Sequence, residues 1–385
     1  MRILHTSDWH IGRRLGRHDR MDETSEALND VVRVAEEERV DLVVVSGDVF
    51  DRPVPPVEAL TLGLGALLRL ATDRPVVVVA GKHDSPELFD ALAPLLRPRG
   101  VHAIGAIRSP DAGGLLGPDE LGVPAVVAGF PFLREGRVVD FMAQTGRWYG
   151  QYAERVAAIT AAYNEALVAR AGDDLVPILV AHFMVTGVRV SHSERELHIG
   201  DAYTATAQAI PAGPQYVALG HIHAPQSVPG AAVPAEYAGS LLALDFGEAG
   251  ETKRLVLVDV EPGTLATVRS VPITAGRPLV AARGTWDELA ARAPELADSY
   301  VDLTVAVGGP DPELGRRAAE LFPYLVRVRA ERPAAERRER RHPTDRPTDE
   351  ELYAAFVRAV SGEEPPPDLV ALFHEVLEEA ADASA

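Results

Sequence analysis

The sequence predicts an α/β fold, in which buried strands alternate with helices, and three observations support this prediction. Short runs rich in Val, Ile and Leu recur along the chain, with helical segments between them. Most of these runs end in Gly, Asp or His. A second alternation of strands and helices begins near Gly276. Alternation of this kind is typical of an α/β core.

The composition limits the class of protein and its chemistry. A chain of 385 residues is long enough for more than one domain, and 46% hydrophobic with 25% charged residues is typical of a soluble globular protein. The absence of cysteine excludes disulfides, thiolate metal sites and thiol nucleophiles. No apolar run reaches the roughly 18 to 20 residues of a membrane span, and the chain opens directly on a strand. We therefore expect a cytoplasmic protein with no membrane association.

The first elements each lead into polar side chains. Residues 2–7 form an apolar strand that ends in Ser7-Asp-Trp-His10, and a helix follows at about 21–38. A strand at 42–48 ends in Asp48, and Asp51 lies three residues later. Prolines then precede a helix at 57–71. Because that helix is apolar nearly all round, we expect it to be buried, either in the core or against another subunit.

The pattern continues through the middle of the chain. A strand at 75–81 leads into Lys82-His-Asp84, and a strand at 178–182 ends in His182. Further strands are expected near 101–107 and 124–130, with a helix at 150–171. Segments 236–240 and 254–260 are interpreted as strands that complete a second sheet.

The motif Val217-Ala-Leu-Gly-His-Ile-His223 carries the clearest chemical signal. His221 and His223 are two residues apart, so both point to one side if the extended geometry continues. Asp8 and His10 share this spacing. A pair of surface histidines is the alternative interpretation of such a motif. The recurrence of Asp and His at the ends of five strand-like runs instead indicates a ligand-binding crevice beyond the strands.

These ligand types point to particular metals and a particular reaction. Carboxylate and imidazole ligands without sulfur suit manganese, iron or zinc. One carboxylate shared by two cations about 3.5–4 Å apart is the arrangement that polarises a phosphate ester.

The last third of the chain predicts three further segments. Strands and helices between 275 and 330 predict a small second α/β domain after a main domain at 1–274. Residues 331–347 are rich in Arg and Pro and are interpreted as an exposed linker. Residues 348–385 contain two amphipathic helices separated by Pro365-Pro-Pro367. Their apolar faces comprise Leu352, Phe356, Val360, Leu369, Leu372, Phe373, Val376 and Leu377.

These motifs together resemble the calcineurin-like metallophosphoesterases, whose pattern is D-x-H, G-D-x-x-D, G-N-H-D, a histidine after a strand, and G-H-x-H. More narrowly, Thr6-Ser-Asp-Trp-His-Ile-Gly12 and Gly220-His-Ile-His223 look like the SbcD family, the nuclease subunits of bacterial SbcCD exonucleases. The resemblance covers nearly the whole chain. It implies two packed β-sheets flanked by helices, a small α/β capping domain and a C-terminal helical segment that binds a partner.

The resemblance also implies a role for each motif residue. Two divalent cations, with manganese expected, would be bound: the first by Asp8, His10 and His223, the second by His182 and His221, with Asp48 bridging. His83 would assist departure of the sugar oxygen, with Asp84 fixing its orientation. Asp51 closes the G-D-x-x-D motif, either in catalysis or as a carboxylate behind the ligands.

Lys82 departs from the family pattern, which has Asn before the catalytic histidine. A protonated lysine has donors and no acceptor, so it cannot ligate a cation. The ammonium would either replace part of the second cation's charge or reflect an inactivating or engineered substitution. Activity is therefore in question at this position, while the fold is not.

A basic segment follows the first motif and is a candidate DNA contact. Arg13, Arg14 and Arg17 lie close in sequence to Asp8 and His10. The net charge of −19 argues against a general nucleic-acid-binding surface but allows a local basic groove.

The leading functional interpretation is a two-metal DNA exonuclease and endonuclease that cleaves double-strand ends and hairpins. The resemblance implies that it acts in DNA repair and recombination with an SbcC-like coiled-coil ATPase, as a homodimer within a heterotetramer. One alternative is a phosphoesterase acting on a nucleotide or other small ester. Another is a DNA-end-binding scaffold whose chemistry Lys82 has disabled.

Overall fold

The computed structural model describes residues 1–134, 152–191, 204–331, 349–361 and 365–382. The chain divides into two compact units, one of Met1–Val305 with Asp311–Ala330 and one of Ala306–Pro310 with Glu331–Ala385. No helix in the described part of the chain is long and apolar enough to cross a membrane.

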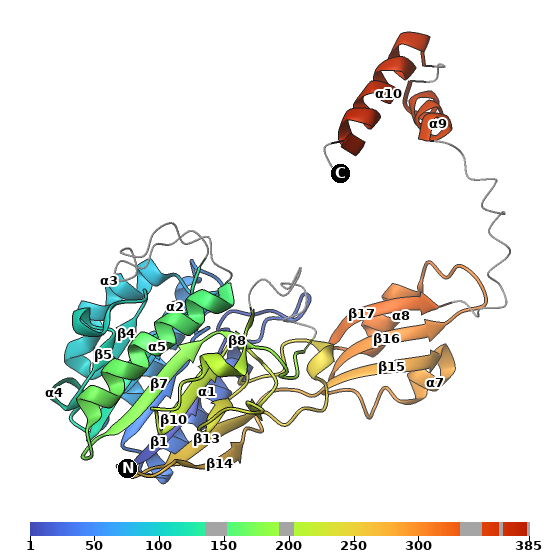
Figure 1. The fold of residues 1–385 in the computed structure, drawn as a ribbon. Coiled ribbons are helices and arrows are strands. Elements are labelled where there is room, and N and C mark those ends of the chain that lie inside the picture. The colour runs from blue at the N-terminus through green and yellow to red at the C-terminus, as the bar shows by residue number, and fades with distance from the viewer. Residues whose placement is uncertain (135–151, 192–203, 332–348, 362–364, 383–385) are drawn as a thin grey trace. The chain divides into compact units, whose positions relative to one another are not determined.

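A six-stranded sheet forms one half of the centre of the first unit (Figure 1). Its spatial order is β14-β13-β1-β2-β3-β4. The strands are β1 (Arg2–Thr6), β2 (Leu42–Val45), β3 (Val76–Val79), β4 (Val101–Ile104), β13 (Arg254–Asp259) and β14 (Thr267–Pro272). Strands β1 to β4 run parallel, whereas β13 pairs antiparallel with β1 and with β14.

A second six-stranded sheet has the order β11-β12-β10-β7-β6-β5. Its strands are β5 (Leu115–Leu116), β6 (Ala125–Phe130), β7 (Val176–His182), β10 (Tyr216–Gly220), β11 (Gln226–Ser227) and β12 (Ala235–Tyr237). The four central strands are parallel, and the two short edge strands are antiparallel. Two further short strands, β8 (Met184–Val185) and β9 (Thr204–Ala205), form a separate pair.

The two sheets pack against each other because their strands are apolar on both faces. In β2, Leu42 and Val44 face the core between the sheets, whereas Val43 and Val45 join the core on the outer face. Strand β3 alternates in the same way. Strands buried on both faces read as continuous Val and Leu runs, which explains the sequence pattern.

Helices cover the outer faces of both sheets. Helices α1 (Met21–Glu37), α2 (Val57–Leu70) and α3 (Pro86–Leu96) contribute to the core outside the first sheet. Helix α5 (Tyr152–Ala171) covers the second sheet, and α4 (Pro118–Leu121) is a single turn. The predicted α/β architecture of two packed sheets with flanking helices is confirmed.

Residues 279–331 form the second alternation that the sequence predicts. A three-stranded sheet has the order β15-β16-β17, and its elements are β15 (Leu279–Thr285), α7 (Trp286–Ala291), β16 (Tyr300–Ala306), α8 (Leu314–Leu321) and β17 (Leu325–Glu331). Most of these residues cluster in the first unit. The boundary between 274 and 275 therefore stays a prediction.

The second unit contains the two helices expected near the C-terminus, α9 (Asp349–Ser361) and α10 (Pro367–Asp382). They pack on each other, with the rings of Tyr353 and Phe373 stacked at 4.1 Å between centroids. The predicted linker at 331–347 lies outside the described residues except for Glu331.

One expectation needs correction. The strand at 254–260 does not complete the second sheet; β13 joins the first sheet beside β1. The cause is that pairing partners far apart in sequence leave no local signature.

Helix α2 is buried in the core on one face, where Gly63 and Leu67 pack on the first sheet. Val57 is 74% exposed and Leu68 is 38% exposed in the single chain. Burial of that face against another subunit stays a prediction.

Candidate metal centre

The candidate residues follow the carboxyl ends of parallel strands from both sheets. Asp8 and His10 follow β1, Asp48 follows β2, and His83 follows β3. In the second sheet, His182 is the last residue of β7, and His221 and His223 follow β10. Because these strand ends lie at one edge of the paired sheets, the side chains converge there.

The structure brings seven of the predicted residues into three overlapping groups. Within each group the potential ligand atoms lie within 4.8 Å of one another. The groups are Asp8, His10 and His223; His10, Asp48 and His83; and Asp48, His182 and His221. All are buried except His83, which is half-buried.

The backbone at these positions differs from the extended geometry that the i, i+2 spacing suggested. Strand β10 ends at Gly220, and His221 has a φ of 98°. Asp8, His10 and Asp48 also have positive φ, at 50°, 45° and 51°. The extended geometry on which the same-face interpretation depended therefore does not continue at these positions. Asp8 and His10 still fall in one group, whereas His221 and His223 fall in different groups, as the family resemblance implied. Strained backbone in non-glycine residues clusters at functional sites, where it aims side chains that a regular strand would not.

Glycines allow the strand ends to approach closely. A Cβ on Gly220 would lie 2.0 Å from the carbonyl oxygen of Ser46 and 2.8 Å from Nδ1 of His182. A Cβ on Gly81 would lie 2.2 Å from the Oδ1 of Asp48. These positions tolerate no side chain, so the ligand-bearing loops pack directly on one another.

Several ring nitrogens are placed for a cation more than for hydrogen bonds. The Nε2 atoms of His10 and His223 face each other at 3.1 Å. Nε2 of His182 is buried without a hydrogen-bond partner and lies 3.4 Å from Oδ2 of Asp48. Its Nδ1 is 2.7 Å from the carbonyl oxygen of Ser46, which directs Nε2 toward the group. Histidine ligands are commonly oriented in this way by a bond to the other ring nitrogen.

Burial makes the charge balance of this cluster unusual. Burial raises the pKa of Asp8 to about 6, although His182 and His223 oppose the shift. Burial alone would lower the pKa of His182, but the Asp48 carboxylate raises it to about 9. Burial lowers the pKa of His10 and His221 well below the usual range. His10 and His221 are therefore neutral near pH 7, whereas Asp48 holds a proton on His182. A divalent cation would supply the positive charge beside Asp48 in place of that proton.

His83 and Asp84 have different surroundings. The imidazole Nδ1 of His83 lies 3.2 Å from the backbone oxygen of Asp51, and its backbone N–H donates to Asp48 at 2.7 Å. The Asp84 carboxylate accepts from the N–H groups of Gly81 and Phe50. Burial, with Asp48 nearby, raises the pKa of Asp84 to about 7. In these contacts Asp84 holds the loops around His83 in place. The ring of His83 itself contacts the backbone oxygen of Asp51.

Lys82 lies near Asp48 and His221, which belong to the group that also contains His182. Its side chain is half-buried, and burial lowers its pKa while Asp48 raises it. The lysine charge also contributes to the lowered pKa of His221. The backbone oxygen of Lys82 accepts from Nη2 of Arg134 at 3.0 Å.

The basic segment lies partly at this site. Nη1 of Arg13 is 3.4 Å from Oδ1 of Asp51, the carboxylate next to His10. Arg14 donates to the backbone oxygen of Arg17 at 2.6 Å, and both side chains are exposed. Their contact with DNA stays a prediction.

Sequence reasoning missed a buried ion pair behind His223. Glu248 is completely buried, and its Oε1 lies 3.3 Å from Nδ1 of His223. Nζ of Lys253 donates to Oε2 of Glu248 at 2.7 Å. No spacing links these residues to the histidine motifs, so the fold alone brings them together.

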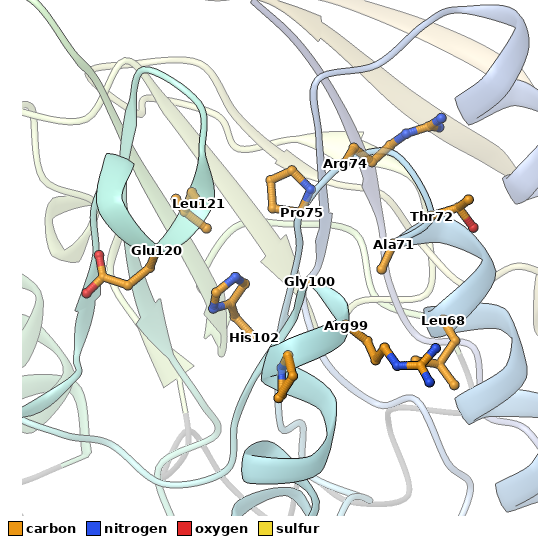
Figure 2. Close-up of a pocket in the computed structure, with 11 residues that line it drawn as sticks. Leu68, Ala71, Thr72, Arg74, Pro75, Arg99, Gly100, His102, Glu120 and Leu121 are labelled. Atoms are coloured by element: carbon orange, nitrogen blue, oxygen red, sulfur yellow. The ribbon is translucent and has the colours of Figure 1, made fainter.

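A pocket of about 510 Å³ is separate from these groups (Figure 2). It lies near Pro75 and Gly100, where β3 and β4 begin, so it is at the other end of the sheet. The ends of Arg74 and Arg99 extend away from His102 in this view. Glu120 places a negative charge in the same lining. None of the seven candidate ligands lines this pocket.

Comparisons with known proteins agree with the geometry. Residues 1–225 match the model of the calcineurin-like phosphoesterase family. The chain is 36% identical over 295 residues to the SbcD subunit of nuclease SbcCD from Bacillus subtilis (strain 168), covering 73% of this chain and 71% of that protein. The protein of the same name from Escherichia coli (strain K12) is 30% identical, covering 88% and 87%. That from Rhodobacter capsulatus is 33% identical, covering 87% and 82%.

Proposed function

Because this chain belongs to the calcineurin-like phosphoesterase family and, within it, to the SbcD family, we propose that it is a metal-dependent DNA nuclease. Its substrates would be double-strand ends and hairpins. The observation that carries the proposal is the convergence of three Asp and His groups at the strand ends of both sheets. The family and these groups together support divalent-cation binding.

We assign the ligands to two cations, with manganese as the proposed metal. Asp8, His10 and His223 would hold the first. His182 and His221 would hold the second, and Asp48 lies in two of the three groups, which suits a bridging carboxylate. When bound, the cations would polarise the phosphodiester and stabilise the charge that develops on its oxygens.

The protein's own residues then position and protonate the substrate. Nδ1 of His83 donates to the Asp51 backbone oxygen, so Nε2 is the nitrogen that would give a proton to the departing sugar oxygen. This step requires both ring nitrogens to carry a proton beforehand, and it would leave a neutral imidazole with its proton on Nδ1. The half-buried position of His83 allows the imidazole to reach substrate. The Asp84 carboxylate, bonded to Gly81 and Phe50, would keep the His83 loop in place.

Lys82 makes the proposed second site weaker than the first. It supplies a positive charge where the family has a neutral ligand, so two cations should bind with unequal affinity, and the site of Asp8, His10 and His223 should fill first. This feature also favours a second candidate function, a DNA-end-binding scaffold with little hydrolytic activity.

The relatives' name comes from the SbcCD nuclease, and we propose a corresponding assembly for this chain. The partner would be an SbcC-like coiled-coil ATPase, bound by residues 348–385. The domain boundaries at 274 and 330, the homodimer within a heterotetramer and the cytoplasmic location belong to the same proposal.

One assay separates these functions. The purified chain is incubated with Mn²⁺ and a labelled duplex, in parallel with a bis-phenyl phosphate ester. Degradation of the duplex supports the nuclease. Hydrolysis of the small ester without duplex cleavage favours a small-molecule phosphoesterase, and duplex binding without either reaction favours the scaffold.

A further inference from the structure

A buried ion pair holds His223 at two points. The Glu248 carboxylate, at the end of a short helical turn over Phe246–Glu248, lies with Oε1 3.3 Å from the imidazole Nδ1 of His223. Nζ of Lys253 donates both to Oε2 of Glu248, at 2.7 Å, and to the backbone oxygen of His223, at 3.0 Å. The pair therefore restrains the ring through one member and the main chain through the other.

The two oxygens of Glu248 face different sets of donors. Oε2 accepts from Nζ of Lys253 and from the N–H of Leu244 at 3.0 Å, with the hydroxyl of Ser240 at 3.4 Å. Oε1 lies near the His223 ring and 3.2 Å from the hydroxyl of Ser191. Because Lys253 and the Leu244 N–H can only donate, the group in the Oε2 position must be an acceptor.

A cation and a backbone donor both contact the buried carboxylate. Nζ of Lys253 and the N–H of Leu244 both donate to Oε2 of Glu248, which is completely buried. A buried ion pair contributes little net stability compared with apolar packing, and removal of one partner is costly. Stability alone therefore does not account for an ion pair placed behind a candidate ligand.

We infer that Glu248 and Lys253 are positioning residues that set the tautomer and direction of His223 for the first cation. With its proton on Nδ1 and donated to Glu248, His223 presents an unprotonated Nε2 toward Nε2 of His10, 3.1 Å away. Carboxylates behind metal-binding histidines act in this way, and their loss typically reduces metal affinity about 10–100-fold. The inference rests on the proposed function, because it assigns His223 to a cation.

The substitution Glu248→Gln tests the tautomer directly. Lys253 and the Leu244 N–H require the amide oxygen in the Oε2 position, so the amide NH₂ must face Nδ1 of His223. A donor there favours the proton on Nε2, which is the nitrogen that the cation needs. Nitrogen-15 NMR of the metal-free protein should show His223 protonated on Nδ1 in the natural chain and on Nε2 in the variant. An unchanged tautomer would overturn the inference without involving any metal.

Metal titration gives the second measurement. Calorimetry with Mn²⁺ should show the first cation bound about 10–100-fold more weakly in Glu248→Gln, with the second cation unchanged. The unchanged second site shows that the variant has folded. Lys253→Met should weaken the first site less, because Glu248 still accepts from the ring.

Glu236→Gln is the matched control. Glu236 is also buried and paired with a cation, with Oε2 2.6 Å from Nη2 of Arg254, but it contacts no candidate ligand. Its replacement should leave both cations and the tautomer unchanged. If Glu248→Gln and the natural chain bind the first Mn²⁺ with equal affinity, the role of Glu248 is contradicted but the proposed function is not. A natural chain that binds no Mn²⁺ would contradict the proposed function and the role of Glu248 with it.

Discussion

At the scale of single residues, we expect Lys82 to limit the activity of the proposed site. The substitution Lys82→Asn removes a positive charge from beside His221 and Asp48 and supplies an oxygen ligand. Because recovery of one cation restores several kcal/mol of transition-state stabilisation, we expect Mn²⁺-dependent cleavage of duplex DNA to rise roughly a hundredfold or more. Initial rates on a labelled duplex measure this.

Two further variants separate the effect of the lysine charge from that of the added ligand and test the role of His83. Lys82→Met removes the charge without adding a ligand, so it should recover only part of the gain. His83→Ala in the Lys82→Asn background should abolish cleavage while Mn²⁺ and DNA still bind. An unchanged rate in Lys82→Asn would mean that Lys82 does not affect the second cation.

His5 predicts a dependence of stability on pH. Its ring bridges the two sheets, 2.8 Å from the hydroxyls of both Tyr216 and Ser46. Burial, with a smaller effect of Arg254, lowers the pKa of His5 from 6.5 to about 3. Between pH 6.5 and about 3, His5 binds a proton in the unfolded chain but not in the folded chain. The free energy of unfolding therefore decreases as pH falls below 6.5. Urea unfolding should show a loss of about 2 kcal/mol from this residue between pH 6.5 and 5.

His5→Gln provides the comparison. The variant should be less stable at neutral pH because it loses a buried bridge, but its stability should change less between pH 6.5 and 5. Identical pH dependence in the two proteins would show that His5 does not cause the loss of stability between pH 6.5 and 5.

The convergence of the candidate residues could be predicted from sequence, but their geometry could not. Spacing and residue type pointed to Asp8, His10, Asp48 and the later histidines, and the structure brings them together. The positive φ of His221 is invisible in the motif. The His221 N–H donates to the carboxylate of Asp8, which follows a strand of the other sheet, and the sequence does not show this contact. Glu248 gave no signal at all, since it reaches His223 only through the fold.

At the scale of elements, the glycine that ends β10 allows the loops of the two sheets to approach closely at the candidate site. A methyl group at Gly220 would collide with Ser46, which follows β2, and with Nδ1 of His182 at the end of β7. We expect Gly220→Ala to destabilise the fold by a few kcal/mol, as overpacking of a rigid core does, and to weaken the second cation's site. Thermal unfolding and Mn²⁺ titration measure the two effects.

Gly65→Ala is the matched control within α2. A Cβ at Gly65 meets nothing within 4 Å, and alanine favours a helix by about 0.5–1 kcal/mol over glycine. This variant should be slightly more stable, with unchanged metal binding. If Gly220→Ala were equally harmless, the strand ends would have more room than the close contacts indicate.

Strand and helix locations were largely predictable because period-two and helical patterns are local. The sheet to which a strand belongs is not local. Strand β13 follows β12 in the chain, yet it pairs with β1 because Val256 and Val258 fill the core between the sheets from that side. The apolar composition of α2 predicted burial in the core or against another subunit, and the sequence did not indicate which face would pack on the sheet.

At the scale of the whole molecule, the chain has two units with different surfaces. The first unit buries its apolar residues around two sheets. In the second, α9 and α10 contact each other through Tyr353 and Phe373 but leave apolar side chains exposed. Those more than half exposed are Leu352, Phe356, Leu372 and Val376. Exposed apolar residues on a helix pair are typical of a surface that docks on another helix.

The resulting prediction concerns truncation after Arg346, which removes both helices. Because every proposed ligand lies in the first unit, the shortened chain should keep Mn²⁺ binding and cleavage of short duplexes. It should no longer co-purify with an SbcC-like ATPase.

The double variant Leu352→Asp with Phe356→Asp should reproduce this loss in the full chain, since charges on the exposed apolar face of α9 prevent apolar contact. Ala355→Asp, at another exposed position of α9, should leave the complex intact. Co-purification of the truncated chain with its partner would place the binding surface elsewhere in the molecule.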